Sequence, residues 1–248
     1  MTLPLLTYDG TPRAVLDPFR DEGFTFPAKM LYAFITPENV ATFVARYPHK
    51  VVGEFVTVSN HFEVYALTVG DQQIGLCRAP LGAPAATQLL DFLIAYGAKQ
   101  IIAVGSCGVL VETPENQLMV ATRALRDEGT SFHYLPAAAT VALDETLTTH
   151  LMTVLGTAVR PVQTWTTDGY FRETEQKIAA SLAAGCEVVE MECAALAACA
   201  EFRAVQFAQL LFTADSLAAV AAYDARDFGV ASHLRVLAAG LDCLAQLA

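Results

Sequence analysis

The most regular feature of the sequence is a series of short apolar runs separated by segments rich in polar and turn-forming residues. The runs are five to nine residues long, which is the usual length of a β-strand. Two of them alternate loosely on either side of Ser59-Asn60 and indicate a hairpin. The predicted strands are 29–35, 51–58, 61–69, 73–79, 100–105, 117–121, 158–164 and 207–212.

Several segments between these runs carry the end signals and apolar spacing of helices. Thr36, Pro37 and Glu38 supply an N-cap, a proline at the first helical position and an acidic residue in the first turn. Gly97 suits the position just after a helix, and the alanines of 193–200 are strong helix formers. The predicted helices are 36–46, 85–96, a segment from Thr140 or Asp144 to 155, 193–200 and 228–247.

The mixture of strands and helices places the chain in the α/β class. Its 248 residues suit one α/β domain, and no Pro/Gly/Ser-rich linker divides it. Residues 1–28 contain four prolines and are predicted to be an irregular N-terminal lead-in. Residues 29–248 are predicted to form a single domain.

Composition narrows the classes of partner. A net charge of −11 argues against binding nucleic acid or an anionic membrane. We expect no membrane span, because no run of about 18 uncharged apolar residues occurs, and no signal peptide at the N-terminus. The six cysteines lack paired or zinc-binding spacing, which predicts buried thiols in a cytoplasmic protein without a metal site. The high apolar content, 54%, indicates surface hidden in a homo-oligomer.

Three carboxylates flank the helix and strand predicted within 188–217. Glu190 and Glu192 stand at the helix start, and Asp215 comes just past the strand. Ligands of open α/β sheets bind beyond the carboxyl ends of strands, which favours a functional site here. Acidic residues also favour the first turn of a helix, and Asp after a strand serves in turns and caps. The pattern alone leaves both interpretations open.

Three segments resemble the nucleoside phosphorylase/nucleosidase superfamily, whose members include purine nucleoside and uridine phosphorylases. Residues 188–202 (VVEMECAALAACAEF), with TADS at 213–216, resemble its Glu-Met-Glu helix start and its later Ser-Asp or similar pair. Residues 101–110 (IIAVGSCGVL) are similar to its Gly-Ser/Thr-Cys-Gly turn. Residues 165–174 (WTTDGYFRET) resemble the base-site segment of its bacterial and archaeal phosphorylases. The matches occur in the family's order and cover roughly residues 30–240.

The resemblance implies a three-layer α/β/α fold with a mixed central sheet, and cleavage of the N-glycosidic bond of a nucleoside. Asp215 would then protonate the departing base, supported by Arg226. Glu192 would bind the ribose hydroxyls, with Glu190 as a second carboxylate and Met191 against the sugar. The other implied substrate-binding residues are Tyr170, Thr167 and Leu81, and the implied phosphate or nucleophile region comprises Ser106, Gly105, Cys107 and Gly82.

The nucleophile is less defined than the rest of the implied site. The resemblance implies ribosyl transfer to phosphate as co-substrate, with no other cofactor, in a trimer or hexamer. However, Asn39 and Ala103 occupy the positions that match two phosphate-binding arginines, and nothing in the sequence places Arg78 in the site. Hydrolysis by water is therefore the first alternative, and a catalytically weak protein that binds a nucleoside or base is the second.

Overall fold

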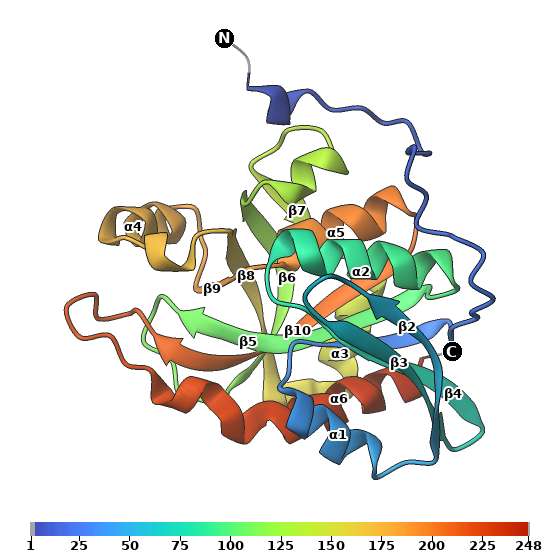
Figure 1. Cartoon of the computed structure of the whole chain (residues 1–248). Coiled ribbons are helices and arrows are strands. Elements are labelled where there is room, and N and C mark those ends of the chain that lie inside the picture. The colour runs from blue at the N-terminus through green and yellow to red at the C-terminus, as the bar shows by residue number, and fades with distance from the viewer. Residues whose placement is uncertain (1–2, 248) are drawn as a thin grey trace.

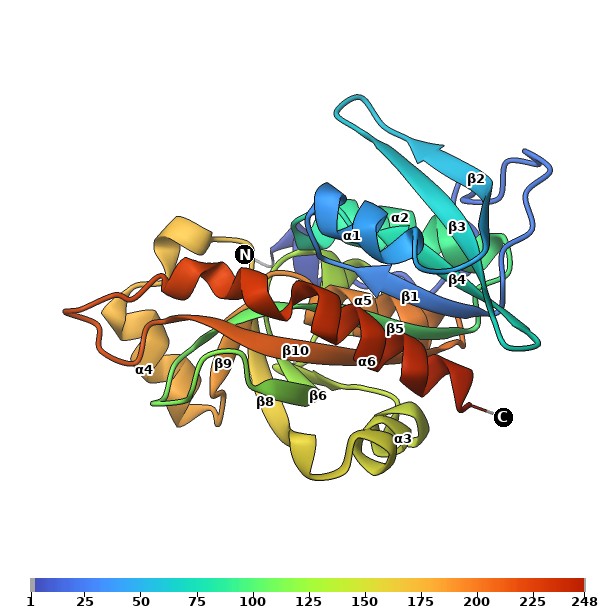
Figure 2. The same cartoon turned by 90° about the horizontal axis from the view of Figure 1, so that it is seen from below.

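A mixed ten-stranded β-sheet lies between two layers of helices (Figure 1). The structure is a computed structural model that describes residues 3–247. Helices α2 (Ala83–Ala95) and α5 (Cys193–Phe202) cover one face of the sheet. Helices α1 (Pro37–Val44), α3 (Glu145–Leu155) and α6 (His233–Ala245) cover the other (Figure 2). The three-layer α/β/α fold with a mixed sheet is therefore confirmed.

All eight predicted strands occur, including the hairpin around Ser59-Asn60. Two further strands, β7 and β9, were not predicted, because three residues are too few to show a periodicity. The strands are β1 (Lys29–Ala33), β2 (His49–Val56), β3 (His61–Val69), β4 (Gln72–Arg78), β5 (Gln100–Val109), β6 (Leu118–Asp127), β7 (Thr140–Ala142), β8 (Val159–Thr167), β9 (Val188–Glu190) and β10 (Gln206–Ser216).

Part of the sheet closes on itself. Strand β5 pairs with β9 on one edge and with β10 on the other, and β10 pairs in turn with β6. Because β6 also pairs with β8, and β8 with β9, these five strands form a ring. The ring brings the ends of β9 and β10, which carry the predicted carboxylates, to the end of β5.

Three expected boundaries are wrong. The segment 106–108, expected to be a turn, lies inside β5, because pairing with β9 and β10 extends that strand to Val109. Likewise β6 runs through 122–127, expected to be loop-rich, because β7 and β8 pair with it. Asp215 lies within β10 rather than past it, since β10 stays paired with β5 as far as Ser216.

The helix ends follow the predicted signals in part. Asp144, not Thr140, caps α3, and its carboxylate accepts a hydrogen bond from the Leu147 N–H at 2.7 Å. Gly97 follows α2 with φ +130°, a conformation that favours glycine. Thr36 precedes α1 but makes no side-chain cap.

The C-terminal helix begins later than predicted. Left-handed residues 227–229 interrupt the segment as part of a 3-10 stretch, η5 (Arg226–Ser232), before α6 starts at His233. Residues Arg226–Ala245 are together long and apolar enough to span a membrane by length and composition alone. However, α6 packs its apolar side on the sheet core beside Leu31 and Val104, so it is a core helix of this fold.

Residues 3–28 of the lead-in contain one short 3-10 turn, η1 (Pro4–Leu6), and no other helix or strand. Its last part is nevertheless fixed to α2. Phe24 and Phe26 pack against Phe92 and Tyr96, and the Phe26 N–H donates to the Tyr96 carbonyl at 2.9 Å.

Candidate active site

Glu190 is buried at the end of β9, and its carboxylate is occupied by the protein itself. One oxygen accepts hydrogen bonds from the hydroxyls of Thr164 and Thr166, at 3.2 and 2.6 Å. The other accepts from the backbone N–H groups of Glu192 and Cys193, at 2.7 and 2.6 Å. Glu190 thus caps α5 from the preceding strand. The sequence pattern had placed Glu190 at the start of the helix, but the residue lies in strand β9.

Because Glu190 supplies the cap, the Glu192 side chain is directed elsewhere. Its Oε1 atom accepts a hydrogen bond from the backbone N–H of Gly82 at 2.6 Å. Gly82, with φ +93°, precedes α2, so the contact joins the starts of the two helices on this face of the sheet. Glu192 is only 5% exposed. Met191 lies between the two glutamates and is half-buried.

Asp215 is directed by an irregularity in β10. The pairing of β10 with β5 shifts register between Thr213 and Ser216, and such bulges re-aim side chains. A Cβ placed on Gly108 would lie 3.3 Å from an Asp215 carboxylate oxygen, so the carboxylate lies against the end of β5. The buried Cys107 thiol has a raised pKa, from burial first and then from the charges of Glu190 and Asp215. Cys107 therefore lies close to both carboxylates.

Burial raises the pKa of Asp215, which is 8% exposed. A hydrogen bond with the Tyr223 hydroxyl and the charge of Arg226 oppose that shift. The Arg226 guanidinium also donates to the Thr113 carbonyl at 2.9 Å and lies 3.5 Å from the Asp224 carboxylate. Arg226 therefore lies near Asp215, but its guanidinium also contacts Thr113 and Asp224 of the surrounding loops.

The two glutamates also have raised pKa values. Burial is the main cause for both, and for Glu192 the neighbouring charge of Glu190 is the second. Glu190 and Asp215 thus lie at the end of β5, whereas Glu192, two residues after Glu190, directs its carboxyl to Gly82. Such clusters of perturbed acids are typical of sites that move protons or stabilise cationic species.

The residues predicted for the phosphate or nucleophile region lie along β5. Gly105, Ser106 and Cys107 are consecutive strand residues, so Ser106 points to the opposite face from its neighbours. Ser106 is exposed although the residues on either side are buried. Leu81, before Gly82, is 77% exposed.

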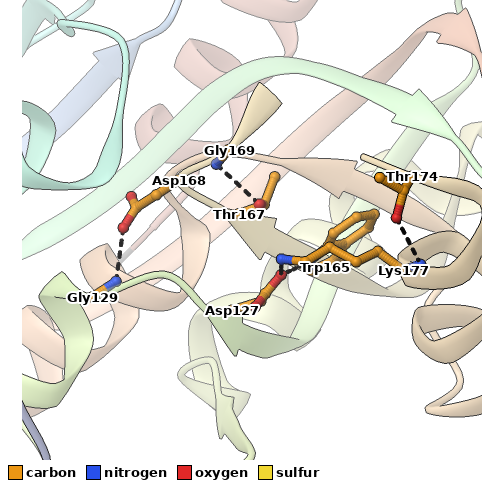
Figure 3. Close-up of polar contacts among 8 residues, drawn as sticks. All are labelled: Asp127, Gly129, Trp165, Thr167, Asp168, Gly169, Thr174 and Lys177. Carbon is orange, nitrogen blue, oxygen red and sulfur yellow. Dashed lines mark hydrogen bonds and ion pairs between the residues drawn. The ribbon is translucent and has the colours of Figure 1, made fainter. Parts of the chain in front are cut away.

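The predicted base segment, 165–174, begins in the last residues of β8 and continues past its end (Figure 3). Thr167 ends β8, and its hydroxyl accepts from the Gly169 N–H at 3.1 Å. The Asp168 carboxylate accepts from the Gly129 N–H at 2.8 Å, which ties this segment to the end of β6. Tyr170 begins a single 3-10 turn, η4 (Tyr170–Arg172). Burial first, and then the nearby Tyr170 and Asp215, raise the pKa of the Tyr223 phenol.

A second set of contacts in Figure 3 fixes the helix after this segment, α4 (Glu175–Ala183). Asp127 accepts from the Trp165 indole at 3.0 Å and forms an ion pair with Lys177 at 2.7 Å. The Lys177 ammonium also lies 5.9 Å from the centre of the Trp165 ring. Strands β6 and β8 thereby hold α4 in place.

Sequence reasoning missed two residues at this site. Tyr223, in the loop after β10, lies near enough to Asp215 to affect the pKa of that acid, and no sequence pattern signals this proximity. Glu173 lies near enough to Asp215 for their charges to interact. It stands in the segment 165–174 already singled out, three residues after Tyr170, and that spacing could have identified it.

The positions that lack arginines are committed to other contacts. The Asn39 amide lies 3.0 Å from a His233 ring nitrogen and donates to Thr36 at 3.1 Å. Ala103 is fully buried in the core beneath α2 and α5. The Arg78 guanidinium lies over the Phe62 ring, 4.9 Å from its centre.

A cavity of about 1720 Å³ lies between the lead-in and α2. It extends to Pro84 and Asp168, which follow Gly82 and Thr167 closely in sequence. The lead-in therefore lines one side of an open cleft, and none of the candidate site residues lines that cleft. Within residues 3–247, no three His, Cys, Asp or Glu side chains gather as a metal site.

Comparison with known proteins identifies the protein family of this chain. Residues 35–243 match the phosphorylase superfamily. The chain belongs to that superfamily. A search of functionally curated proteins finds no match.

Solved structures of the same fold include both phosphorylases and nucleosidases. Uridine phosphorylase from Vibrio fischeri ES114 aligns with TM-score 0.77 at 21% identity, covering 94% of this chain and 95% of its own. Purine nucleoside phosphorylase from Toxoplasma gondii, solved with immucillin-H, gives 0.72 at 17%, covering 90% and 93%. AMP nucleosidase from Bacteroides thetaiotaomicron VPI-5482 gives 0.70 at 21%, covering 89% and 88%. The predicted family, and an enzyme class that cleaves N-glycosidic bonds, are confirmed.

Proposed function

We propose that this protein cleaves the N-glycosidic bond of a nucleoside, with Asp215 as the proton donor to the leaving base. The observation that supports this most directly is the burial of Glu190 and Asp215 beside Cys107 and Gly108 at the end of β5, with Glu192 two residues after Glu190. Bond cleavage leaves negative charge on the base and positive charge on the ribose. A desolvated aspartic acid suits the first charge, and buried carboxylates suit the second.

Glu192 is the proposed ligand of the ribose hydroxyls. Its carboxylate is held by the Gly82 N–H, while Glu190 is fully engaged in capping α5. Glu190 would therefore position the start of α5, and Glu192 would bind the ribose hydroxyls. Arg226 and Tyr223 would support Asp215, and Tyr170 and Met191 would contact base and sugar.

Two nucleophiles are compatible with this site. Ribosyl transfer to phosphate is the first candidate, since uridine and purine nucleoside phosphorylases share the fold. Hydrolysis by water is the second, and the hydrogen bonds of Asn39 to Thr36 and His233 favour it. A charge-assisted phosphate contact is absent at that position, and hydrolysis requires none.

A panel of nucleosides incubated with and without phosphate, with products separated by chromatography, tests this proposal. Ribose 1-phosphate indicates phosphorolysis, and free ribose indicates hydrolysis. Binding without any product would support a nucleoside-binding protein with little catalysis and would contradict the proposal.

We further propose a cytoplasmic homo-oligomer, a trimer or hexamer. Exposed apolar side chains support burial in subunit contacts, among them Phe171 at 92% and Val58 at 110% exposure. Light scattering coupled to size-exclusion chromatography measures the assembly. A monomer at micromolar concentration would contradict this part of the proposal.

A further inference from the structure

Ser106 places its hydroxyl on the face of the sheet that α1 and α6 cover (Figure 2). Its register partner on β10 is Phe212, whose ring lies in the core beneath those helices. Paired residues of neighbouring strands direct their side chains to the same face. Unlike Phe212, Ser106 is exposed, and its hydroxyl has no hydrogen-bond partner within residues 3–247. Accessible space therefore lies beside this hydroxyl.

His233, the first residue of α6, approaches Ser106 from the side of β10. Its ring packs on the ring of Phe212, with 5.6 Å between the two centroids. Gly229 permits this approach, because a Cβ at that position would lie 2.7 Å from the Phe212 ring. Since Phe212 is the ladder neighbour of Ser106, the histidine lies along the β10 flank of the serine.

Asn39 approaches Ser106 from the opposite side, that of β1. The Phe34 N–H donates to the Val104 carbonyl at 2.8 Å, so the chain that leaves β1 still runs beside β5 just before Ser106. Asn39 follows in the first turn of α1, and its amide nitrogen lies 3.0 Å from Nδ1 of His233. The contact between Asn39 and His233 thus joins the two flanks of the serine.

This contact determines which ring nitrogen of His233 carries the hydrogen. The Asn39 amide nitrogen also donates to the Thr36 hydroxyl at 3.1 Å, so both of its hydrogens are directed at acceptors. Nδ1 of His233 therefore accepts, and the neutral ring carries its hydrogen on Nε2. Burial lowers the pKa of His233, which keeps the ring neutral near pH 7. In the described part of the chain, Nε2 has no hydrogen-bond partner, although the residue is only 7% exposed.

The acid proposed to protonate the base lies further along the same face of β5. Gly108 is two residues after Ser106, so both positions face the same side of the strand. A Cβ on Gly108 would lie 3.3 Å from an Asp215 carboxylate oxygen. With a rise of about 3.3 Å per residue, Ser106 and Gly108 are about 7 Å apart. That spacing leaves room for a ribosyl carbon between the acid and a nucleophile held at Ser106.

We propose that His233 positions the water molecule that attacks the nucleoside. Its Nε2–H donates to the water oxygen, and the Ser106 hydroxyl accepts a hydrogen bond from the same water. The water oxygen forms the bond to C1′ while the glycosidic C–N bond breaks and its electron pair leaves with the base. The base takes the proton of Asp215, and the proton that the water loses restores that acid through solvent. This inference rests on the proposed function and selects hydrolysis within it.

The groups around Ser106 suit water better than phosphate. A phosphate dianion is usually held by charged donors, whereas the ring of His233 is neutral and the Ser106 hydroxyl is uncharged. Both hydrogens of the Asn39 amide are already used within the protein. A single water needs only a donor and an acceptor in fixed positions, and His233 and Ser106 supply them.

The main test compares the parent with His233→Phe, which keeps a ring against Phe212 but removes both nitrogens. Nucleosides are cleaved in buffer that contains methanol, which competes with water for C1′ and gives a methyl riboside. We expect the ratio of free ribose to methyl riboside to fall about three- to tenfold, the effect of one hydrogen bond. The kcat should fall while KM for the nucleoside changes little. A purely structural role of His233 would change stability without changing the product ratio.

His150→Phe is the matched control. His150 contacts the Cys243 carbonyl at 2.9 Å near the other end of α6, so its replacement should cost stability but keep the product ratio. Asn39→Leu removes the group that fixes the tautomer and should shift the ratio in the same direction as His233→Phe. NMR of nitrogen-labelled histidine reports the tautomer directly. We expect hydrogen on Nε2 of His233 in the parent and a mixture of tautomers in Asn39→Leu.

The outcomes separate this inference from the proposed function. A parental product ratio in His233→Phe overturns the inference and leaves nucleoside cleavage standing. Hydrogen on Nδ1 of His233 in the parent does the same. Cleavage that occurs only with phosphate, giving ribose 1-phosphate alone, also overturns the role in positioning water while the N-glycosidic chemistry stands. If no nucleoside is cleaved, the proposed function itself fails, and the inference fails with it.

Discussion

The backbone N–H of Gly82 donates a 2.6 Å hydrogen bond to the carboxylate of Glu192, 110 residues further along the chain. This contact joins the loop after β4 to the start of α5. It depends on the conformation of Gly82, whose φ of +93° and ψ of 141° suit only glycine. The backbone conformation of Gly82 thus orients the carboxylate of Glu192, the candidate ligand of the sugar, at the start of α5.

Gly82→Ala should therefore damage both stability and activity. No atom lies within 4 Å of the added methyl group, so the cost comes from backbone strain, about 1–3 kcal/mol. The strained loop should move its N–H away from Glu192 and raise KM for the nucleoside. Gly70→Ala, in the exposed turn after β3, is the control, because its φ of +58° also disfavours alanine, although less strongly, far from the site. Urea denaturation and steady-state kinetics on both variants check this, and a Gly82 variant with parental KM would contradict it.

Substitutions at the two glutamates should separate stability from activity. Glu190→Gln places an amide against two backbone N–H donors, and we expect the free energy of unfolding to fall by about 2–3 kcal/mol. Glu192→Gln keeps an oxygen for the Gly82 N–H but removes the charge. Its stability should stay within about 1 kcal/mol of the parent, while kcat falls about 10²-fold. If Glu190→Gln proves as stable as the parent, Glu190 is not the cap on which α5 depends.

Asp215→Asn should lower kcat by about 10²–10⁴-fold, because an amide cannot protonate the leaving base. Stability should hold or rise slightly, since burial disfavours the charged form that the amide replaces. The parent must act with Asp215 protonated, so its kcat should fall as pH rises through the raised pKa of this acid. The variant should lack that limb of the pH profile. Asp242→Asn on α6 is the matched control, and parental turnover in the Asp215 variant would remove this residue from the mechanism.

Phosphate should bind weakly or not at all. Asn39 is held by Thr36 and His233, and Ala103 is buried, so two charge-assisted contacts are absent. Each such contact typically contributes about 1.5–3 kcal/mol to binding. We therefore expect a dissociation constant for phosphate in the millimolar range or weaker. Calorimetric titration with phosphate measures it, and Arg78→Ala tests the nearest alternative cation. Micromolar affinity that survives Arg78→Ala would show that another cation, such as one from a neighbouring subunit, enters the site.

Local signals in the sequence were sufficient for most elements. Apolar runs predicted eight strands, and caps such as Asp144 and Gly97 predicted helix ends, because these depend on neighbours a few residues away. The motif around Glu190–Glu192 and Asp215 identified the family for the same reason. The chemical residue types and their order along the chain are properties of the sequence alone.

What each of those residues does was decided by the tertiary structure. Glu190 and Glu192 are both acidic residues of one short sequence motif. The Glu190 carboxylate accepts hydrogen bonds from four donors of the protein, whereas the Glu192 carboxylate accepts one from Gly82. The segment 106–108 looked like a turn, but pairing with β9 and β10 makes it strand. Glu173 and Tyr223 join Asp215 only because the ring of strands and η4 bring their elements together. Hydrogen-bond partners and desolvation depend on segments distant in the chain, and no local pattern encodes them.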